Sequence, residues 1–337
     1  MPESPSAALT SPAVGASRRA ASGAQVELAH GNQRATVVEV GGALRTYTIG
    51  TQPLLDGYEI DEPCADARGQ TMIPWPNRLR DGTYRYRDTD HQLPLSEPEK
   101  HNAIHGLVRW VPWSIADRDR DWVAMTHTLH PQAGWPFLMD LRIDYQLGPS
   151  GLSLRTTAAN AGAEPAPYGA GAHPYLMLGT ATIDELLLQS PGTRWTPLDD
   201  QGIPTGSQPV EGTEFDFRVA RRIGSTKLDT GYADLERDER GVAHVQLRHA
   251  RTRSSVRLWM DANYQFLMLF TGDSLQNAER RRKGLGVEPM TCAPNALQSG
   301  DGLRTLEPGE SCTSTWGISP DIGTAARAAP SDGANNG

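Results

Sequence analysis

Hydrophobic and polar residues alternate with a period of two in several segments of the chain. In residues 141–147, Leu, Ile, Tyr and Leu occupy every second position and polar residues lie between them. This is the pattern of a strand with one buried face and one solvent face. It recurs in residues 152–155, 245–248 and 256–260, whereas the spacing of amphipathic helices is scarce. We therefore predict many strands and few helices.

Glycine and proline separate these segments. The 34 Gly and 25 Pro are spread through the chain instead of being concentrated in one linker, which is typical of short strands joined by turns. The fold class we predict is all-β, a large antiparallel β-sandwich with few short helices. No fixed-period repeat or break in composition divides it, so we expect one domain over residues 25–321. The flanks, residues 1–24 and 322–337, lack periodicity and are predicted to be disordered.

Composition narrows the class of protein. Hydrophobic residues make up 38% of the 337 residues, enough for a folded core, and the net charge of -8 argues against nucleic-acid binding. No apolar stretch has the roughly 18 residues of a membrane helix, and no apolar segment follows Arg18-Arg19, so we expect neither a membrane span nor a secretory signal. The three cysteines, Cys64, Cys292 and Cys312, lie far apart and favour a cytoplasmic protein without disulfides.

Five short motifs, distant from one another in the sequence, each contain a polar residue beside Gly, Pro or an aromatic segment. They contain Asn77-Arg78, His105, His173, Asp229 and Glu288. These side chains can act together only if the fold brings them onto one surface. Their types suit acid and base chemistry on a hydroxylated ligand. The sequence therefore predicts an enzyme whose partner is a small-molecule sugar.

Three of these residues are candidates for proton transfer. His105 precedes Gly106, which permits a sharp turn, and His173 precedes Pro174, which favours an extended backbone. Histidine, with an ordinary pKa of about 6.5, exchanges protons near neutral pH. Apolar neighbours around Glu288 would raise its pKa and make it a better base. Each residue also has a structural interpretation, namely a histidine hydrogen-bonded at a turn or a carboxylate in a salt bridge at the rim.

Trp75, Asn77 and Arg78 are candidates for substrate binding. Arg78 could donate two hydrogen bonds to sugar hydroxyls or hold a catalytic carboxylate, and a surface ion pair is the alternative. Trp75 could form an apolar platform for a sugar ring, or it could be a core residue. The basic run at residues 280–283 is interpreted as a solvated loop. Zinc-type spacing and Gly-rich nucleotide loops are absent from the sequence, so we predict no metal and no cofactor.

The order of these motifs and the residues within them resemble the aldose 1-epimerase (galactose mutarotase) family over roughly residues 25–320. The segments that carry the resemblance are Trp75-Pro76-Asn77-Arg78-Leu79, His101-Asn102-Ala103-Ile104-His105-Gly106, Gly171-Ala172-His173-Pro174-Tyr175-Leu176, Leu228-Asp229-Thr230-Gly231-Tyr232 and Val287-Glu288-Pro289-Met290-Thr291. Because five motifs occur in the family's order, the resemblance is specific.

The resemblance implies a β-supersandwich and a cofactor-free enzyme that interconverts the α and β anomers of a free aldohexose such as glucose or galactose. In such an enzyme Glu288 would take the proton of the C1 hydroxyl, and His173 would protonate the ring oxygen. Arg78, His105 and Asp229 would bind the sugar, with His105 also near the ring oxygen.

Two departures from the better-known galactose mutarotases place the chain in a divergent branch of that family. Asp229 is followed by Thr-Gly-Tyr instead of His-Asn-Phe, and Glu288 by Pro-Met-Thr instead of a Thr-Gln-type continuation. Three alternatives with the same fold stay open. One is a hexose-6-phosphate 1-epimerase, for which residues 280–283 are the candidate phosphate-binding group. Another is a sugar-binding protein without catalysis, and the third is a pocket that serves a modified or uronic sugar.

Overall fold

The computed structural model describes residues 19–322. Of the predicted disordered flanks, residues 1–18 and 323–337 lie outside this part of the chain. Residues 19–24 are described, and they are tied to the fold: Ser22 is buried, and its carbonyl accepts a hydrogen bond of 3.0 Å from the N–H of Val40. The chain is therefore tied to the fold a few residues before the predicted start of the domain.

The largest sheet is antiparallel and contains all four segments that alternation predicted as strands. Every second residue of its strand β12 is buried. In sheet order the strands are β10 (Ser114–Arg118), β11 (Trp122–Leu129), β12 (Met139–Gly148), β13 (Gly151–Asn160), β27 (Ser311–Asp321), β23 (Ser255–Met260), β22 (Ala243–His249), β17 (Leu186–Gln189) and β20 (Arg221–Arg222).

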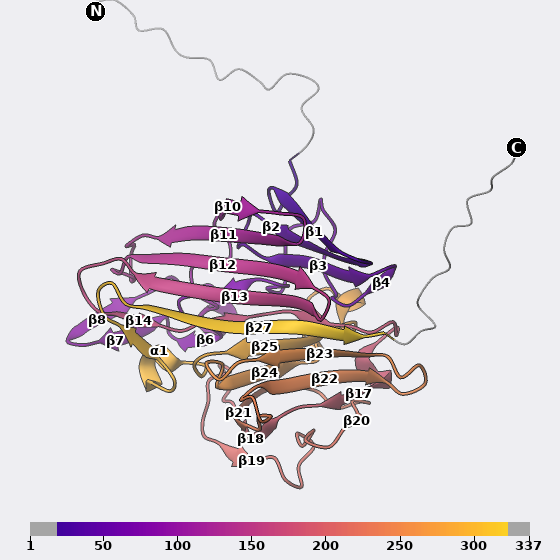
Figure 1. Ribbon diagram of the computed structural model, residues 1–337. Coiled ribbons are helices and arrows are strands. Elements are labelled where there is room, and N and C mark those ends of the chain that lie inside the picture. Colours follow the sequence, from indigo (N-terminus) through magenta and orange to yellow (C-terminus); the bar gives the residue numbers. More distant parts are fainter. Residues whose placement is uncertain (1–18, 323–337) are drawn as a thin grey trace, which may run out of the picture.

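A second antiparallel sheet packs against the first. Its strands in order are β19 (Gln208–Pro209), β18 (Gly192–Thr196), β21 (Asp229–Leu235), β24 (Phe266–Phe270), β25 (Leu285–Met290), β15 (Gly171–Ala172) and β5 (Thr71–Met72), and β16 (Tyr175–Leu176) also pairs with β25. One hydrophobic core contains Ile143 and Leu154 of the first sheet and Leu269 and Val287 of the second. Figure 1 shows β24 and β25 behind the long strands of the first sheet. The predicted antiparallel sandwich is confirmed.

Smaller elements surround the sandwich. A four-stranded sheet consists of β1 (Gln25–His30), β2 (Gln33–Val38), β3 (Leu44–Ile49) and β4 (Gln52–Pro53). Three strand pairs are β6 (Arg78–Arg80) with β9 (Asn102–Ile104), β7 (Thr83–Tyr86) with β8 (Thr89–Gln92), and β14 (Ala166–Tyr168) with β26 (Arg304–Leu306). The helices are α1 (Ala296–Ser299) and the short 3-10 turns η1 (Pro98–Lys100), η2 (Ile183–Glu185) and η3 (Ala278–Arg280). Within residues 19–322, none of these helices has the length and apolar character needed to cross a membrane.

The basic run at residues 280–283 differs from the predicted solvated loop. Arg280 donates from Nη1 to Asp56 at 2.7 Å. Arg282 donates from Nε to Asp184 at 2.6 Å and from Nη1 to Asp273 at 3.0 Å. The prediction is therefore wrong for these two arginines, because carboxylates from distant parts of the chain bind them and hold the loop against the sandwich.

Candidate active site

A cavity of about 590 Å³ brings together residues from all five motifs. Its walls contain six of the seven predicted site residues, namely Asn77, Arg78, His105, His173, Asp229 and Glu288. These positions span more than two hundred residues of sequence, and only the folded sheet and its loops make them neighbours. We call this cavity the candidate site.

The register of the second sheet explains how Glu288 reaches the cavity. Strand β25 is buried along its whole length, and Val287 belongs to the sandwich core. Because side chains alternate along a strand, Glu288 points to the opposite face. Gly286, on the same face as Glu288, pairs with Phe270 of β24, which in turn pairs with Asp229 of β21. The sheet therefore presents Asp229 and Glu288 on one surface.

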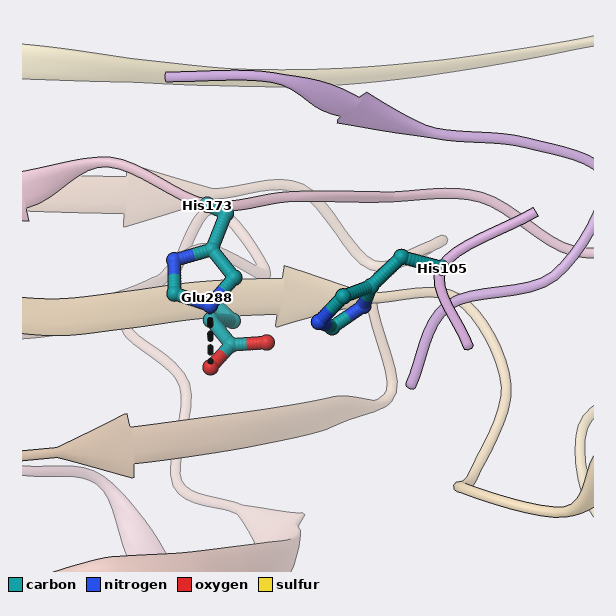
Figure 2. A group of neighbouring side chains, drawn as sticks. All are labelled: His105, His173 and Glu288. Atoms are coloured by element: carbon teal, nitrogen blue, oxygen red, sulfur yellow. Dashed lines mark ion pairs between the residues drawn. The ribbon is translucent and has the colours of Figure 1, made fainter. Parts of the chain in front are cut away.

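His173 lies where the chain passes between strands β15 and β16, beside β25. The carbonyl of Pro174 accepts a hydrogen bond of 3.0 Å from the N–H of Val287, which fixes this segment next to Glu288. The His173 ring stacks on the ring of Tyr175 with centroids 4.9 Å apart. Its Nε2 is 3.2 Å from Oε1 of Glu288, and both side chains are buried (Figure 2).

His105 approaches the same pair from a turn after strand β9. Its backbone is left-handed, with φ of 62°. Two hydrogen bonds join it to Asn77: the His105 N–H donates to the Asn77 carbonyl at 3.0 Å, and the Asn77 N–H donates to Nδ1 of His105 at 3.1 Å. Since Nδ1 accepts, the neutral ring carries its proton on Nε2. Figure 2 shows the outer end of this ring pointing toward Glu288, so His105 presents an N–H donor there.

Burial sets the protonation of the catalytic candidates. It raises the pKa of Glu288 to about 8, with a further rise from the nearby charge of Asp229. Burial also lowers the pKa of His173 to about 3 and that of His105 well below its ordinary value. At neutral pH the carboxyl of Glu288 is therefore protonated and both imidazoles are neutral. A proton passed from Glu288 to His173 would give a carboxylate base beside an imidazolium acid.

The three residues also have the composition of a metal site. One potential ligand atom from each of His105, His173 and Glu288 lies within 4.8 Å of the others. The donor set fits a metal poorly, because the N–H of Asn77 occupies Nδ1 of His105 and leaves the proton on Nε2. A ligating nitrogen must be free of its proton. That the site uses no metal stays a prediction.

Arg78 and Asp229 take different positions on the wall. Arg78 is nearly buried and forms a two-point ion pair with Glu97, from Nε at 2.8 Å and from Nη2 at 3.0 Å. Glu97 thus holds the guanidinium in place, and the interpretation of Arg78 as a surface ion pair is wrong. Asp229 is exposed on the cavity wall, where a hydroxylated ligand can reach its carboxylate.

Trp75 is the one predicted site residue that does not line the cavity. Its side chain is only 2% exposed and packs in the core against Trp135, with ring centroids 6.3 Å apart. The prediction of a sugar platform at Trp75 is therefore corrected to a core role. Trp110 lines the cavity instead and is 57% exposed. Trp110 follows His105 closely in sequence, so it could have been proposed as a site residue because it lies near that motif.

Glu97 and Arg109 also line the cavity and were missed from the sequence. Glu97 lies in a polar, proline-containing stretch typical of an ordinary surface loop. Nothing in its local sequence shows that it pairs with Arg78. Arg109, like Trp110, follows the His105 motif, but a single arginine there carries no pattern of its own.

The sequence of the whole domain matches a known family. The family model for aldose 1-epimerase matches residues 24–319. The chain belongs to the aldose 1-epimerase family. The predicted family is thus confirmed, and membership supports epimerase chemistry on a small-molecule sugar.

Relatives of the family cover most of the chain. YihR of Escherichia coli K12, described as an uncharacterized protein, is 35% identical over 291 residues, which are 86% of this chain and 91% of YihR. The aldose 1-epimerase of the same organism is 26% identical over 219 residues, 62% of each chain. The solved structure of a GalM/aldose epimerase homologue from C. elegans has a TM-score of 0.80 at 18% identity, covering 89% of this chain and 99% of that one. This last likeness supports the fold.

Proposed function

We propose that this protein is a cofactor-independent aldose 1-epimerase that interconverts the α and β anomers of a free aldohexose such as glucose or galactose. The observation that carries the proposal is the buried pair of His173 and Glu288, with Nε2 and Oε1 at 3.2 Å, on the wall of the cavity. Between them the pair has one site that can give a proton and one that can receive a proton. Opening a hemiacetal ring needs both at once.

The reaction begins with the C1 hydroxyl facing Glu288 and the ring oxygen facing His173. Glu288 as carboxylate takes the hydroxyl proton, and His173 as imidazolium gives its proton to the ring oxygen. The bond between C1 and the ring oxygen breaks, its electron pair stays on that oxygen, and C1 becomes an aldehyde. Rotation about the C1–C2 bond turns the other face of the aldehyde toward the ring-closing hydroxyl. Closure with the two proton transfers reversed gives the other anomer.

The resting pair holds its proton on the carboxyl group, because Glu288 has a pKa of about 8 and His173 of about 3. A transfer across the 3.2 Å contact would make Glu288 the base and His173 the acid without a proton from solvent. This transfer runs against the difference between the two pKa values, so its free-energy cost is part of the barrier to ring opening. Each turnover returns the pair to its starting state. No strong nucleophile is needed.

Other groups of the cavity position the sugar. Nε2 of His105 carries a proton and would donate to the ring oxygen. Arg78, held by Glu97, and the exposed carboxylate of Asp229 would bind hydroxyls on the other side of the ring. Asn77 contributes through its backbone, which holds His105, and through a side-chain oxygen that accepts the N–H of Arg78 at 2.8 Å.

The phosphosugar alternative loses its candidate phosphate-binding group. Residues 280–283 are not part of the cavity wall, and Arg280 and Arg282 are paired with carboxylates. A sugar-binding protein without catalysis would keep the same pocket. Its distinguishing property would be anomer binding without faster mutarotation.

Polarimetry of freshly dissolved α-glucose and α-galactose tests the proposal. The wild-type protein should accelerate the approach to the equilibrium rotation with at least one of these sugars, and Glu288→Gln should lower the rate about 10²- to 10⁴-fold, the usual contribution of a general base. Glu279→Gln is the matched control, because Glu279 is exposed in η3 and lies outside the cavity. Full activity of Glu288→Gln would refute the assignment of the base. Saturable binding without acceleration would favour the binding-protein alternative.

A further inference from the structure

Arg109 is a charged group of the cavity that the proposed reaction does not use. It lines the candidate site close to the two histidines and is half-buried. Its Nε is shielded from solvent and has no hydrogen-bond partner, and Nη2 makes one long hydrogen bond of 3.3 Å to the carbonyl of Ile104. No carboxylate within residues 19–322 forms an ion pair with it.

Other arginines that are buried or half-buried have more hydrogen-bond or ion-pair partners. Arg68 pairs with Asp56 at 3.2 Å, and Arg78 pairs with Glu97. Arg237 has no carboxylate in the described range either, but its guanidinium donates to three backbone carbonyls. A guanidinium removed from water without such partners is costly. Burial accordingly lowers the pKa of Arg109. An anion entering the cavity would offset this cost.

The fold holds Arg109 beside the histidines. Gln70 connects the two segments: its side chain donates to the Arg109 carbonyl at 2.8 Å, and its own carbonyl accepts the N–H of His173 at 3.1 Å. Ile104, which accepts from the guanidinium, directly precedes His105. The guanidinium carbon also lies 5.7 Å from the ring centre of the exposed Trp110. The position of Arg109 thus depends on the same segments that position the proton-transfer groups.

The position of Arg109 determines which carbon atom of a bound sugar would lie next to its guanidinium. In the proposed mechanism the histidines face the ring oxygen, and the ring oxygen is bonded to C1 and C5. Glu288 occupies the C1 side. The hydrogen bonds of Arg109 lead to the segments of the two histidines, through Ile104 and Gln70, and none within residues 19–322 leads to strand β25, which carries Glu288. We therefore place Arg109 on the C5 side, next to the exocyclic C6.

We propose that Arg109 binds an anionic substituent on C6 of the aldose, and that the preferred substrate carries a single negative charge there, as a carboxylate or sulfo group. This inference rests on the proposed epimerase function and specifies its substrate class. Guanidinium groups bind such planar or forked oxygens with two hydrogen bonds. One arginine balances a monoanion, whereas a phosphate ester carries a charge of about -1.5 to -2 at neutral pH.

Lys100 provides a contrast within the same cavity. It lines the candidate site, but it also lines an adjoining cavity together with Asp229 and Phe270, on the side away from the histidines. A cation there would not reach C6 of a sugar whose ring oxygen faces His173. Substituting Lys100 therefore controls for the general loss of a positive charge.

The test compares mutarotation rates of glucose, glucuronate, glucose 6-sulfate and glucose 6-phosphate by exchange NMR at constant ionic strength. For the wild-type protein, kcat/KM should be higher for glucuronate or glucose 6-sulfate than for glucose or glucose 6-phosphate. In Arg109→Met this advantage should fall about 10- to 100-fold, the range for losing a charged hydrogen bond. Activity on glucose should change by less than about 3-fold in the variant. Arg109→Lys should restore part of the advantage, and Lys100→Met should keep it.

The outcomes separate this inference from the proposed function. If the wild type prefers glucose to every anionic sugar, or if Arg109→Met lowers all rates equally, the anion site is refuted while the epimerase function stands. A preference for glucose 6-phosphate refutes the monoanionic class. If no sugar is accelerated, the proposed function fails, and calorimetric titration of glucuronate and glucose decides the binding inference by itself: tighter binding of glucuronate that disappears in Arg109→Met supports it, and equal binding refutes it.

Discussion

The buried carboxyl of Glu288 makes the stability of this protein depend on pH in a way that one substitution should remove. In the folded state its pKa is about 8, and its ordinary value is 4.5. Between these values the folded protein holds a proton that the unfolded chain releases. Unfolding therefore releases this proton, and the free energy of unfolding falls as pH rises. Glu288→Gln keeps the size of the side chain and cannot ionise.

His173 limits the useful pH window. Its pKa is about 3 in the folded state and 6.5 ordinarily, so below pH 6.5 its effect has the opposite sign and partly cancels that of Glu288. Above pH 6.5 it is neutral in both states. From there to pH 8, Glu288 should cost about 1.4 kcal/mol per pH unit, or roughly 2 kcal/mol in total. With an unfolding entropy of about 2 cal/mol/K per residue, this corresponds to a fall of about 3 °C in Tm.

Thermal unfolding followed by circular dichroism checks this expectation at half-unit steps from pH 6.5 to 8. Most other titrating groups are common to both proteins, so the difference in Tm between Glu288→Gln and wild type isolates Glu288. That difference should grow in favour of the variant by about 3 °C as pH rises. The exposed-site variant Glu279→Gln should follow the wild type. If the curves for Glu288→Gln and wild type run parallel across the window, the carboxyl is not held protonated and the reasoning is wrong.

Four further substitutions separate chemistry, binding and folding. His173→Gln should lower kcat about 10²- to 10⁴-fold in exchange NMR with little change in KM, and a change confined to KM would contradict its role as acid. Trp110→Ala should raise KM several-fold at constant kcat, whereas Trp75→Phe should lower Tm and leave KM unchanged; the reverse result would restore Trp75 as the sugar platform. Gly106→Ala should lower both Tm and kcat, because φ is 70° and a Cβ would lie 2.0 Å from the carbonyl of Ile73. A variant as stable and active as the wild type would contradict this placement.

Much of this structure was accessible from the sequence because local patterns determine it. The alternation in residues 141–147 depends only on which strand face is buried, and the fold preserves it in β12. Glu288 and His173 were found because each lies in a motif with its own turn residues. Trp75 was placed wrongly because an aromatic residue between prolines has the same sequence signature in a core and in a sugar platform. Packing against Trp135 decides between them, and that contact joins distant parts of the chain.

Pairings between distant charges were the part that the sequence could not predict. The ion pair of Arg78 with Glu97 and the one joining Arg280 to Asp56 both link separate segments of the chain. A charged residue looks the same in the sequence whether its partner is water or a carboxylate far along the chain. That Arg109 lacks such a partner became clear only by comparison with arginines whose guanidinium groups pair with carboxylates.

The two faces of strand β25 couple the chemistry of this protein to its folding. Glu288 points to the cavity while its neighbour Val287 packs in the core, so a change that shifts this strand by one residue would exchange the two. Evolution therefore has little freedom to alter the proton-transfer centre without losing the domain. The cavity rim is different, because Glu99, Lys100 and Trp110 come from connecting segments outside the large sheets. New sugar preferences can arise there while the inherited reaction remains intact.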